Sequence, residues 1–213
     1  MALGFLAMLL ACGEQSADRG PAVTLAAAVE RTIDAESFQV RLTLTDGRER
    51  LVSQFEYAAP DRVRMRLRPR GETVWIAGDT YYATPEEPNR FFLVETACEN
   101  TLEVAVPALT IVRDATDVRR NGPIFVFRSG DVAGFTGQAR LEDGYLASLL
   151  FRYKLPDISR NVIERYSFSR FGDRISIRRP DASLITGTRE AAPNQGSPVP
   201  CPAGPPPTGI ENG

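Results

Sequence analysis

The sequence contains no histidine, and Lys154 is the only lysine among its 25 basic residues. The lack of histidine excludes a Ser-His-Asp or Cys-His nucleophile pair, a histidine metal ligand and a histidine pH switch. Schiff-base chemistry and phosphate binding by a P-loop lysine would each depend on Lys154 alone. The net charge of −2 provides no general cationic field for recruiting nucleic acid. We therefore expect no enzyme, no cofactor, no metal site and no nucleic-acid partner.

The length and composition indicate one globular domain with tails. The chain has 213 residues, of which 43% are hydrophobic and 24% charged, enough apolar material for a single core.

Four aspartates do not suggest acid/base catalysis, because they all occupy predicted turns, where aspartate accepts backbone hydrogen bonds. These residues are Asp61, Asp79, Asp143 and Asp173.

The first eleven residues are typical of an export signal. Residues 2–11 form an apolar run that is too short for a permanent membrane span but suits a secretory signal. The sequence LLACG at 9–13 resembles the bacterial lipobox, which implies cleavage before Cys12 and its acylation by fatty acids such as palmitate. We interpret 1–11 as a signal peptide and 12–21 as a tether to the extracytoplasmic face of the cell membrane. The alternative is a soluble protein in which Cys12 is a buried thiol.

Two further cysteines, Cys98 and Cys201, are available for a disulfide bond. Disulfide bonds persist in the oxidising compartments that exported proteins reach, and the CxxC spacing typical of a metal site is absent from this sequence. A bond closing a loop of about 100 residues would stabilise the fold by about 4–5 kcal/mol in the chain-entropy view. The alternative is two unpaired thiols. The bond would tie back the C-terminal tail, 188–213, whose proline and glycine content predicts that it is mostly disordered.

Hydrophobic periodicity predicts an α+β domain over residues 22–187, with about ten strands and two or three helices. Leu25, Val29 and Ile33 recur every fourth residue, which indicates a helix. The period then changes to two and continues through antiparallel strands joined by short turns. A second helical spacing interrupts the strands near the middle of the chain, and the last predicted strand spans 174–178. Because the strands cluster instead of alternating with helices, a parallel α/β sheet is excluded.

Five stretches of the chain carry a resemblance to a known family. They are Phe55–Arg64, Glu72–Tyr82, Pro107–Asp117, Gly144–Leu149 and Ser167–Ile175. Together they resemble the LolA/LolB superfamily of lipid and lipoprotein carriers, in particular its LppX/LprG-type cell-envelope lipoproteins. The resemblance spans nearly all of residues 24–180. It implies a strongly curved antiparallel half-barrel, helices that close its concave face, an apolar cavity for acyl chains, and no catalytic residues.

Alternation along the strands identifies the side chains that would line such a cavity. Phenylalanine and methionine suit acyl chains, because the first is large and the second is flexible. The alternative is that these side chains fill a closed core, and for any single one of them core packing is the better supported interpretation. The candidates are Val40, Leu42, Leu44, Phe55, Tyr57, Val63, Met65, Leu67, Phe125, Phe127, Phe151, Tyr153 and Phe168.

The segment 62–68 alternates arginine with apolar residues and therefore predicts a row of guanidinium groups on one sheet face. Same-face residues of a strand lie about 6.8 Å apart. One interpretation is docking to phosphate head groups or to an acidic partner. The other, which we favour, is pairing with acids on neighbouring strands. The arginines are Arg62, Arg64, Arg66 and Arg68, with Arg70 beyond them, and the acids are Glu49, Glu56 and Glu72.

Three functions remain compatible with the sequence. The first is a membrane-anchored lipoprotein that binds acyl chains of a lipid or lipoprotein in an apolar cavity and carries them across the cell envelope. The second is a sensing or regulatory envelope lipoprotein that binds a protein partner on the same fold. The third is a structural or interaction lipoprotein with a filled core. A large apolar cavity favours binding, whereas an exposed apolar patch beside a small cavity favours the interaction role.

Overall fold

A computed structural model describes residues 20–68, 71–84, 86–95, 102, 105–129, 135–155 and 160–188. The predicted signal peptide, the predicted acylation site Cys12 and most of the predicted tether lie outside the described residues. So do Cys98, Cys201 and the C-terminal tail from residue 189. The predictions made for them, including the disulfide bond, stay predictions.

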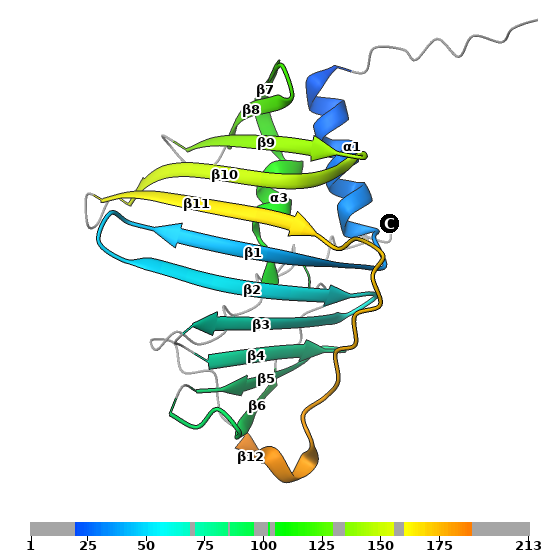
Figure 1. The fold of residues 1–213 in the computed structure, drawn as a ribbon, viewed down its shortest axis with the longest axis vertical. Helices are drawn as coiled ribbons and strands as arrows, with labels where there is room; N and C mark the ends of the chain where they lie inside the picture. The colour runs from blue at the N-terminus through cyan, green and yellow to red at the C-terminus, as the bar shows by residue number, and fades with distance from the viewer. Residues whose placement is uncertain are drawn as a thin grey trace, which may run out of the picture.

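The fold is mostly β and consists of one sheet of twelve strands in the order β12-β6-β5-β4-β3-β2-β1-β11-β10-β9-β8-β7 (Figure 1). Neighbouring strands are antiparallel except β12, which runs parallel to β6. The sheet joins two meanders, β1 to β6 and β7 to β11, where β1 lies beside β11. The strands are β1 (Ser37–Thr45), β2 (Arg50–Ala58), β3 (Arg62–Arg68), β4 (Gly71–Ile76), β5 (Asp79–Ala83), β6 (Phe91–Glu95), β7 (Ala115–Asn121), β8 (Ile124–Ser129), β9 (Thr136–Glu142), β10 (Tyr145–Leu155), β11 (Arg160–Ser169) and β12 (Ile185–Thr188).

The sheet is not strongly curled, so the predicted strongly curved half-barrel is wrong. The edge strands β7 and β12 do not pair with each other, so the sheet is open. The parallel pairing of β12 with β6 extends the sheet sideways instead of closing it. Apolar side chains also occupy both faces of the sheet near β4 and β5, so other parts of the chain pack against each face there.

In the part of the chain that the structure describes, helices α1 and α3 cover one face of the sheet, which we call the helix face (Figure 1). Helix α1 (Pro21–Ile33) begins with a proline, which lacks the N–H that a first helical turn leaves unpaired. It buries Leu25 and Val29, as their spacing predicted, and it contacts α3 (Ala108–Arg113), β7 and β10. Neither of these helices has the length and apolar character needed to span a membrane.

The opposite face, which we call the outer face, carries a second, smaller core. Ile177 is 1% exposed and packs there with Val74 and Tyr81. It belongs to the C-terminal segment 173–184, which crosses the ends of the strands before β12 (orange in Figure 1) and includes the 3-10 helix η1 (Ala182–Leu184). The predicted strand 174–178 is therefore wrong: these residues form no strand, because their apolar side chain packs onto a sheet face instead of extending an edge.

Candidate ligand-binding site

All thirteen predicted cavity residues lie on the helix face, as their alternation required. The registers place Val40 beside Phe55 on β2 and Phe168 on β11, and Phe55 beside Met65 on β3. On the other meander, Phe127 and Phe151 both lie opposite Gly137 of β9. The structure thus brings residues from six strands onto one continuous surface.

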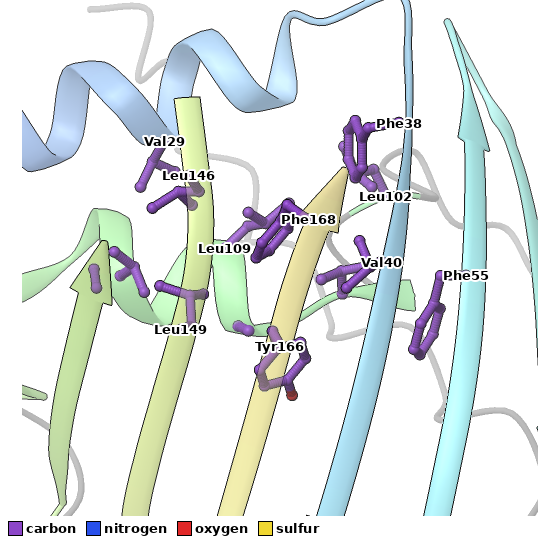
Figure 2. Close-up of a cluster of buried hydrophobic side chains, with 14 of the residues drawn as sticks. Val29, Phe38, Val40, Phe55, Leu102, Leu109, Leu146, Leu149, Tyr166 and Phe168 are labelled. Atoms are coloured by element: carbon purple, nitrogen blue, oxygen red, sulfur yellow. The ribbon is translucent and has the colours of Figure 1, made fainter. Parts of the chain in front are cut away.

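Eight of the thirteen are buried and pack against each other and the helices. Phe127 and Phe151 meet edge-on with ring centroids 6.1 Å apart, a favourable arrangement for aromatic pairs. Figure 2 shows Val29 of α1 near Leu146 and Leu109 of α3 near Phe168. These eight belong to one hydrophobic core, which is the alternative that the sequence left open for each of them. They are Val40, Phe55, Tyr57, Val63, Phe125, Phe127, Phe151 and Phe168.

The other five predicted residues are only partly buried: Leu42, Leu44, Met65, Leu67 and Tyr153. Four of them combine with Leu51, which pairs with Leu44, in a surface that we call the apolar strip. The strip consists of Leu42, Leu44, Leu51, Met65 and Leu67 on β1, β2 and β3. These strands extend beyond the described helices toward the left of Figure 1, so neither helix lies behind their far ends.

A carboxylate borders the apolar strip. Glu164 of β11 lies beside Leu44 on β1 and beside Phe151 on β10. The hydroxyl of Tyr153 donates a hydrogen bond to its Oε1 atom at 2.6 Å, and the hydroxyl of Tyr166 donates one to its Oε2 atom at 2.8 Å. Figure 2 shows the Tyr166 hydroxyl at the margin of the core, directed away from Leu109 and Phe168.

Both tyrosines of this group remain hydrogen-bond donors at neutral pH. Burial raises the pKa of the Tyr153 hydroxyl, and its hydrogen bond to Glu164 raises that pKa further. Burial likewise raises the pKa of the Tyr166 hydroxyl, with the charge of Glu164 as the next cause. The sequence analysis missed both Glu164 and Tyr166. The signal was present, because Val162, Glu164, Tyr166 and Phe168 alternate along one strand.

No cation accompanies this carboxylate among the residues that the structure describes. An aspartate and an arginine lie near the same end of β1 and β11, but they bind each other: Arg160 Nη1 lies 2.6 Å from Asp46 Oδ2. Within the described ranges, no group of three or more cysteine and acidic residues is arranged to hold a metal ion.

Arg64 and Arg66 of the β3 row lie on the outer face and are paired with acids, as we favoured. Arg62 has no ion pair in the described ranges, and the side chain of Arg68 and residue Arg70 lie outside them. Arg64 lies 3.4 Å from Glu56 and 3.1 Å from Glu72, and Arg66 lies 3.9 Å and 3.7 Å from the same two carboxylates. Glu49 was also expected to pair, but the described part of the chain gives it no ion pair. It lies in the turn before β2 and not opposite an arginine.

Cations without described acidic partners lie instead on the outer face of the second meander. Arg119, Arg128, Arg152 and Arg165 are exposed, and none has an acid within 4 Å in the described ranges. A pocket of about 230 Å³ lies beside two of them, Arg119 and Arg128. Its lining residues are Asp117, Arg119, Val126, Phe127, Arg128 and Thr136, of which only Phe127 was a predicted cavity residue. We call the four arginines and this pocket the basic surface.

Comparison with known proteins gives fold similarity only at low sequence identity. No protein-family model matches the sequence, and no curated protein matches it. Among solved structures, the chain is similar to one in the complex of Pseudomonas aeruginosa MucA and MucB, with 14% identity, a TM-score of 0.45, and coverage of 74% of this chain and 59% of that one. It is also similar to an uncharacterized conserved protein from Thermus thermophilus, with 12% identity, a TM-score of 0.48, and coverage of 78% and 98%.

A third similar structure is MucB in complex with MucA(peri), with 12% identity, a TM-score of 0.33, and coverage of 73% of this chain and 55% of that one. The chain therefore spans less than two thirds of the length of both matched chains from the MucA and MucB structures.

Proposed function

We propose that this protein is a membrane-anchored envelope lipoprotein that binds acyl chains of a lipid or lipoprotein and carries them across the cell envelope. The observation that carries the proposal is the apolar strip. Leu42 and Met65 pack against the hydrophobic core. Leu44, Leu51 and Leu67 lie beyond them on the same face, and all five side chains of the strip are only partly buried. Covering such a surface with a hydrocarbon chain removes apolar area from water at about 25 cal/mol per Å².

The chemistry of the strip suits a flexible, elongated ligand. Leu44 lies opposite Leu51, and Leu67 lies opposite Ser53, whose other neighbour on β1 is Leu42. These neighbouring apolar side chains form a continuous surface across three strands, and the thioether of Met65 can adapt to a ligand of varied shape.

Anchoring at the membrane depends on Cys12 in this proposal. A Cys12→Ala variant should accumulate as a precursor without fatty acid, and labelled fatty acid on that variant would contradict the anchor.

A tryptophan in the strip tests the proposal. We expect Leu67→Trp to reduce the lipid that co-purifies with the protein from its own membrane, measured by native mass spectrometry, with little change in melting temperature. Leu67 is partly exposed, so added volume does not have to displace packed neighbours. The matched control is Gln54→Trp, an exposed position on the outer face of the adjacent strand, which should leave bound lipid unchanged.

The lipid content and the melting temperature together decide the outcome. Absence of lipid from the wild-type protein and both variants, combined with a large drop in the melting temperature of Leu67→Trp, would overturn the carrier proposal. It would mean that the strip is part of a closely packed interior.

The basic surface supports a second candidate function, the binding of an acidic protein partner in the envelope. Arg128 on β8 and Arg152 on β10 lie on either side of Thr136 on β9, and Val126 near Arg128 on β8 is 37% exposed. Guanidinium groups around an exposed apolar side chain suit an acidic segment. A photo-crosslinking residue at Thr136 should capture one protein in cells, and the Arg128→Glu variant should abolish that capture. Capture that is unaffected by Arg128→Glu would contradict this function.

A further inference from the structure

We propose that Glu164, held by Tyr153 and Tyr166, binds the positively charged head group of an amphiphile whose hydrocarbon chain lies on the apolar strip. The inference rests on the proposed acyl-chain binding and adds the chemical class of the ligand. It starts from position: Glu164 pairs with Leu44, which belongs to the strip. A head group at the carboxylate and a chain on the strip therefore lie on one continuous surface.

The tyrosine hydroxyls orient the carboxylate without using up its capacity to accept hydrogen bonds. A carboxylate has about four lone-pair sites, and each tyrosine donates one hydrogen. Tyr153 and Tyr166 bind different oxygens of Glu164, at 2.6 Å and 2.8 Å. Each oxygen therefore retains an acceptor site, and the two tyrosine rings restrict the rotation of the side chain between them.

Charge is the second argument. The tyrosine hydroxyls donate hydrogen bonds to the carboxylate, yet they supply no positive charge to balance it. In the part of the chain that the structure describes, no lysine or arginine lies within 4 Å of Glu164, and the nearby Arg160 is already bound to Asp46. An ionised group beside hydrophobic side chains is stabilised by a counter-ion. The lack of a described counter-charge beside Glu164 points to a cationic group on the ligand. An ammonium group also supplies hydrogen-bond donors for the free acceptor sites of the Glu164 carboxylate.

The neighbouring residues favour an amphiphile over a small cation. Glu164 lies between Leu44 and Phe151, and the ring of Tyr153 stacks on Phe135 with centroids 5.8 Å apart. These apolar neighbours offer nothing to a hydrated ion beyond the single carboxylate. They do provide surface for the methylene groups next to a head group.

A matched series of three ligands tests the inference. Dodecylammonium, dodecanol and dodecanoate share one chain length and differ in head-group charge. We expect the wild-type protein to bind dodecylammonium about tenfold more tightly than dodecanol, and dodecanoate more weakly than both, when affinities are measured by calorimetry below the concentrations at which micelles form. Glu164→Gln should remove the preference for the ammonium compound and change dodecanol binding by less than about twofold.

Two controls separate a local effect from a general one. Glu142→Gln removes an acidic charge from an exposed position of β9, so it should preserve the preference for dodecylammonium. Tyr153→Phe keeps the Glu164 charge and removes one of its donors, so it should reduce the preference without abolishing it. Tyr153→Phe also provides a folded test of the site if Glu164→Gln fails to fold.

The outcomes distinguish the two proposals. Equal affinities for all three compounds in the wild-type protein would overturn the role of Glu164 and leave acyl-chain binding intact. An ammonium preference that survives in Glu164→Gln would also overturn it. Failure of all three compounds to bind would overturn the proposed function itself.

Discussion

The hydroxyl of Thr32 on α1 accepts a hydrogen bond from the backbone N–H of Leu146 on β10 at 3.0 Å. The same hydroxyl donates to the carbonyl of Ala28, one turn earlier in the helix, at 2.8 Å. Both Thr32 and Leu146 are fully buried. The bond lies where the register of β10 against β9 shifts, between Leu146 and Ser148. The threonine therefore satisfies a strand N–H at an irregularity of the sheet, and it attaches α1 to β10.

Replacing Thr32 with valine should destabilise the fold by about 1–3 kcal/mol, because the Leu146 N–H would remain buried without an acceptor. The free energy of unfolding in urea measures the effect. Thr32→Ser retains the hydroxyl and should restore a large part of the loss. If valine and serine destabilise equally, the shape of the side chain matters here and the hydrogen bond does not.

Gly137 on β9 leaves room for the ring of Phe127. A Cβ atom added at Gly137 would lie 2.2 Å from two atoms of that ring, which is far inside van der Waals contact. We expect Gly137→Ala to destabilise the protein by about 1–3 kcal/mol through overpacking. Adding Phe127→Leu should recover part of this loss in the double variant, because leucine is smaller. Gly20→Ala, with no atom near its added Cβ, should have little effect on the melting temperature.

Alternation predicted the parts of the sheet where one face is apolar and the other polar. In β3, for example, Val63 and Met65 lie on the helix face, while Arg64 and Arg66 lie on the outer face beside acids. The same reasoning placed all thirteen cavity candidates on one face. Alternation could not show which of these side chains belong to the closed core and which belong to the partly exposed apolar strip, because that depends on where the helices end above the sheet. Leu67 is partly exposed for this reason, although it has the same pattern as Val63.

The sequence signals failed where an element is mostly exposed or packs on an unexpected face. β7 was not predicted because it is an edge strand with five exposed residues out of seven and no apolar alternation. β12 has three exposed residues out of four. Ile177 looked like a strand residue because Ile175 and Ile177 alternate with polar residues, but Ile177 packs with Val74 and Tyr81 on the outer face. Alternation places Glu164 on the face of Phe168, but it does not predict that the hydroxyls of Tyr153 and Tyr166 both bind it.

The C-terminal segment 173–184 should depend on Ile177 more than on its ion pair. Arg179 lies 2.8 Å from Asp79, but both side chains are substantially exposed, so Arg179→Ala should reduce stability by less than about 1 kcal/mol. Ile177→Ala removes a side chain that is 1% exposed and should reduce stability by about 2–5 kcal/mol. Limited proteolysis should then show faster cleavage within 173–184. Equal protection in both variants would contradict the role of Ile177.

Asp46 should make the stability of the protein depend on pH in the acid range. The backbone N–H groups of Glu49 and Arg48 donate to its Oδ1 atom, each at 2.9 Å, and Arg160 binds its Oδ2 atom. These interactions, led by the two backbone hydrogen bonds, hold the pKa of the folded-state carboxyl well below its ordinary value of about 4. Because the folded state binds the proton more weakly than the unfolded state, the stabilisation is complete above the unfolded pKa. It is lost as the pH falls through the folded pKa.

Asp46→Asn should therefore be less stable than the wild-type protein at pH 7, and the difference should shrink as the pH is lowered from about 4. Urea unfolding at a series of pH values between 7 and 2 measures both curves. Asp143→Asn changes an exposed turn aspartate with no ion pair in the described residues, and it should unfold like the wild-type protein at pH 7. A gap between wild type and Asp46→Asn that stays constant down to pH 2 would show that the charge of Asp46 does not hold the β1–β2 turn against β11.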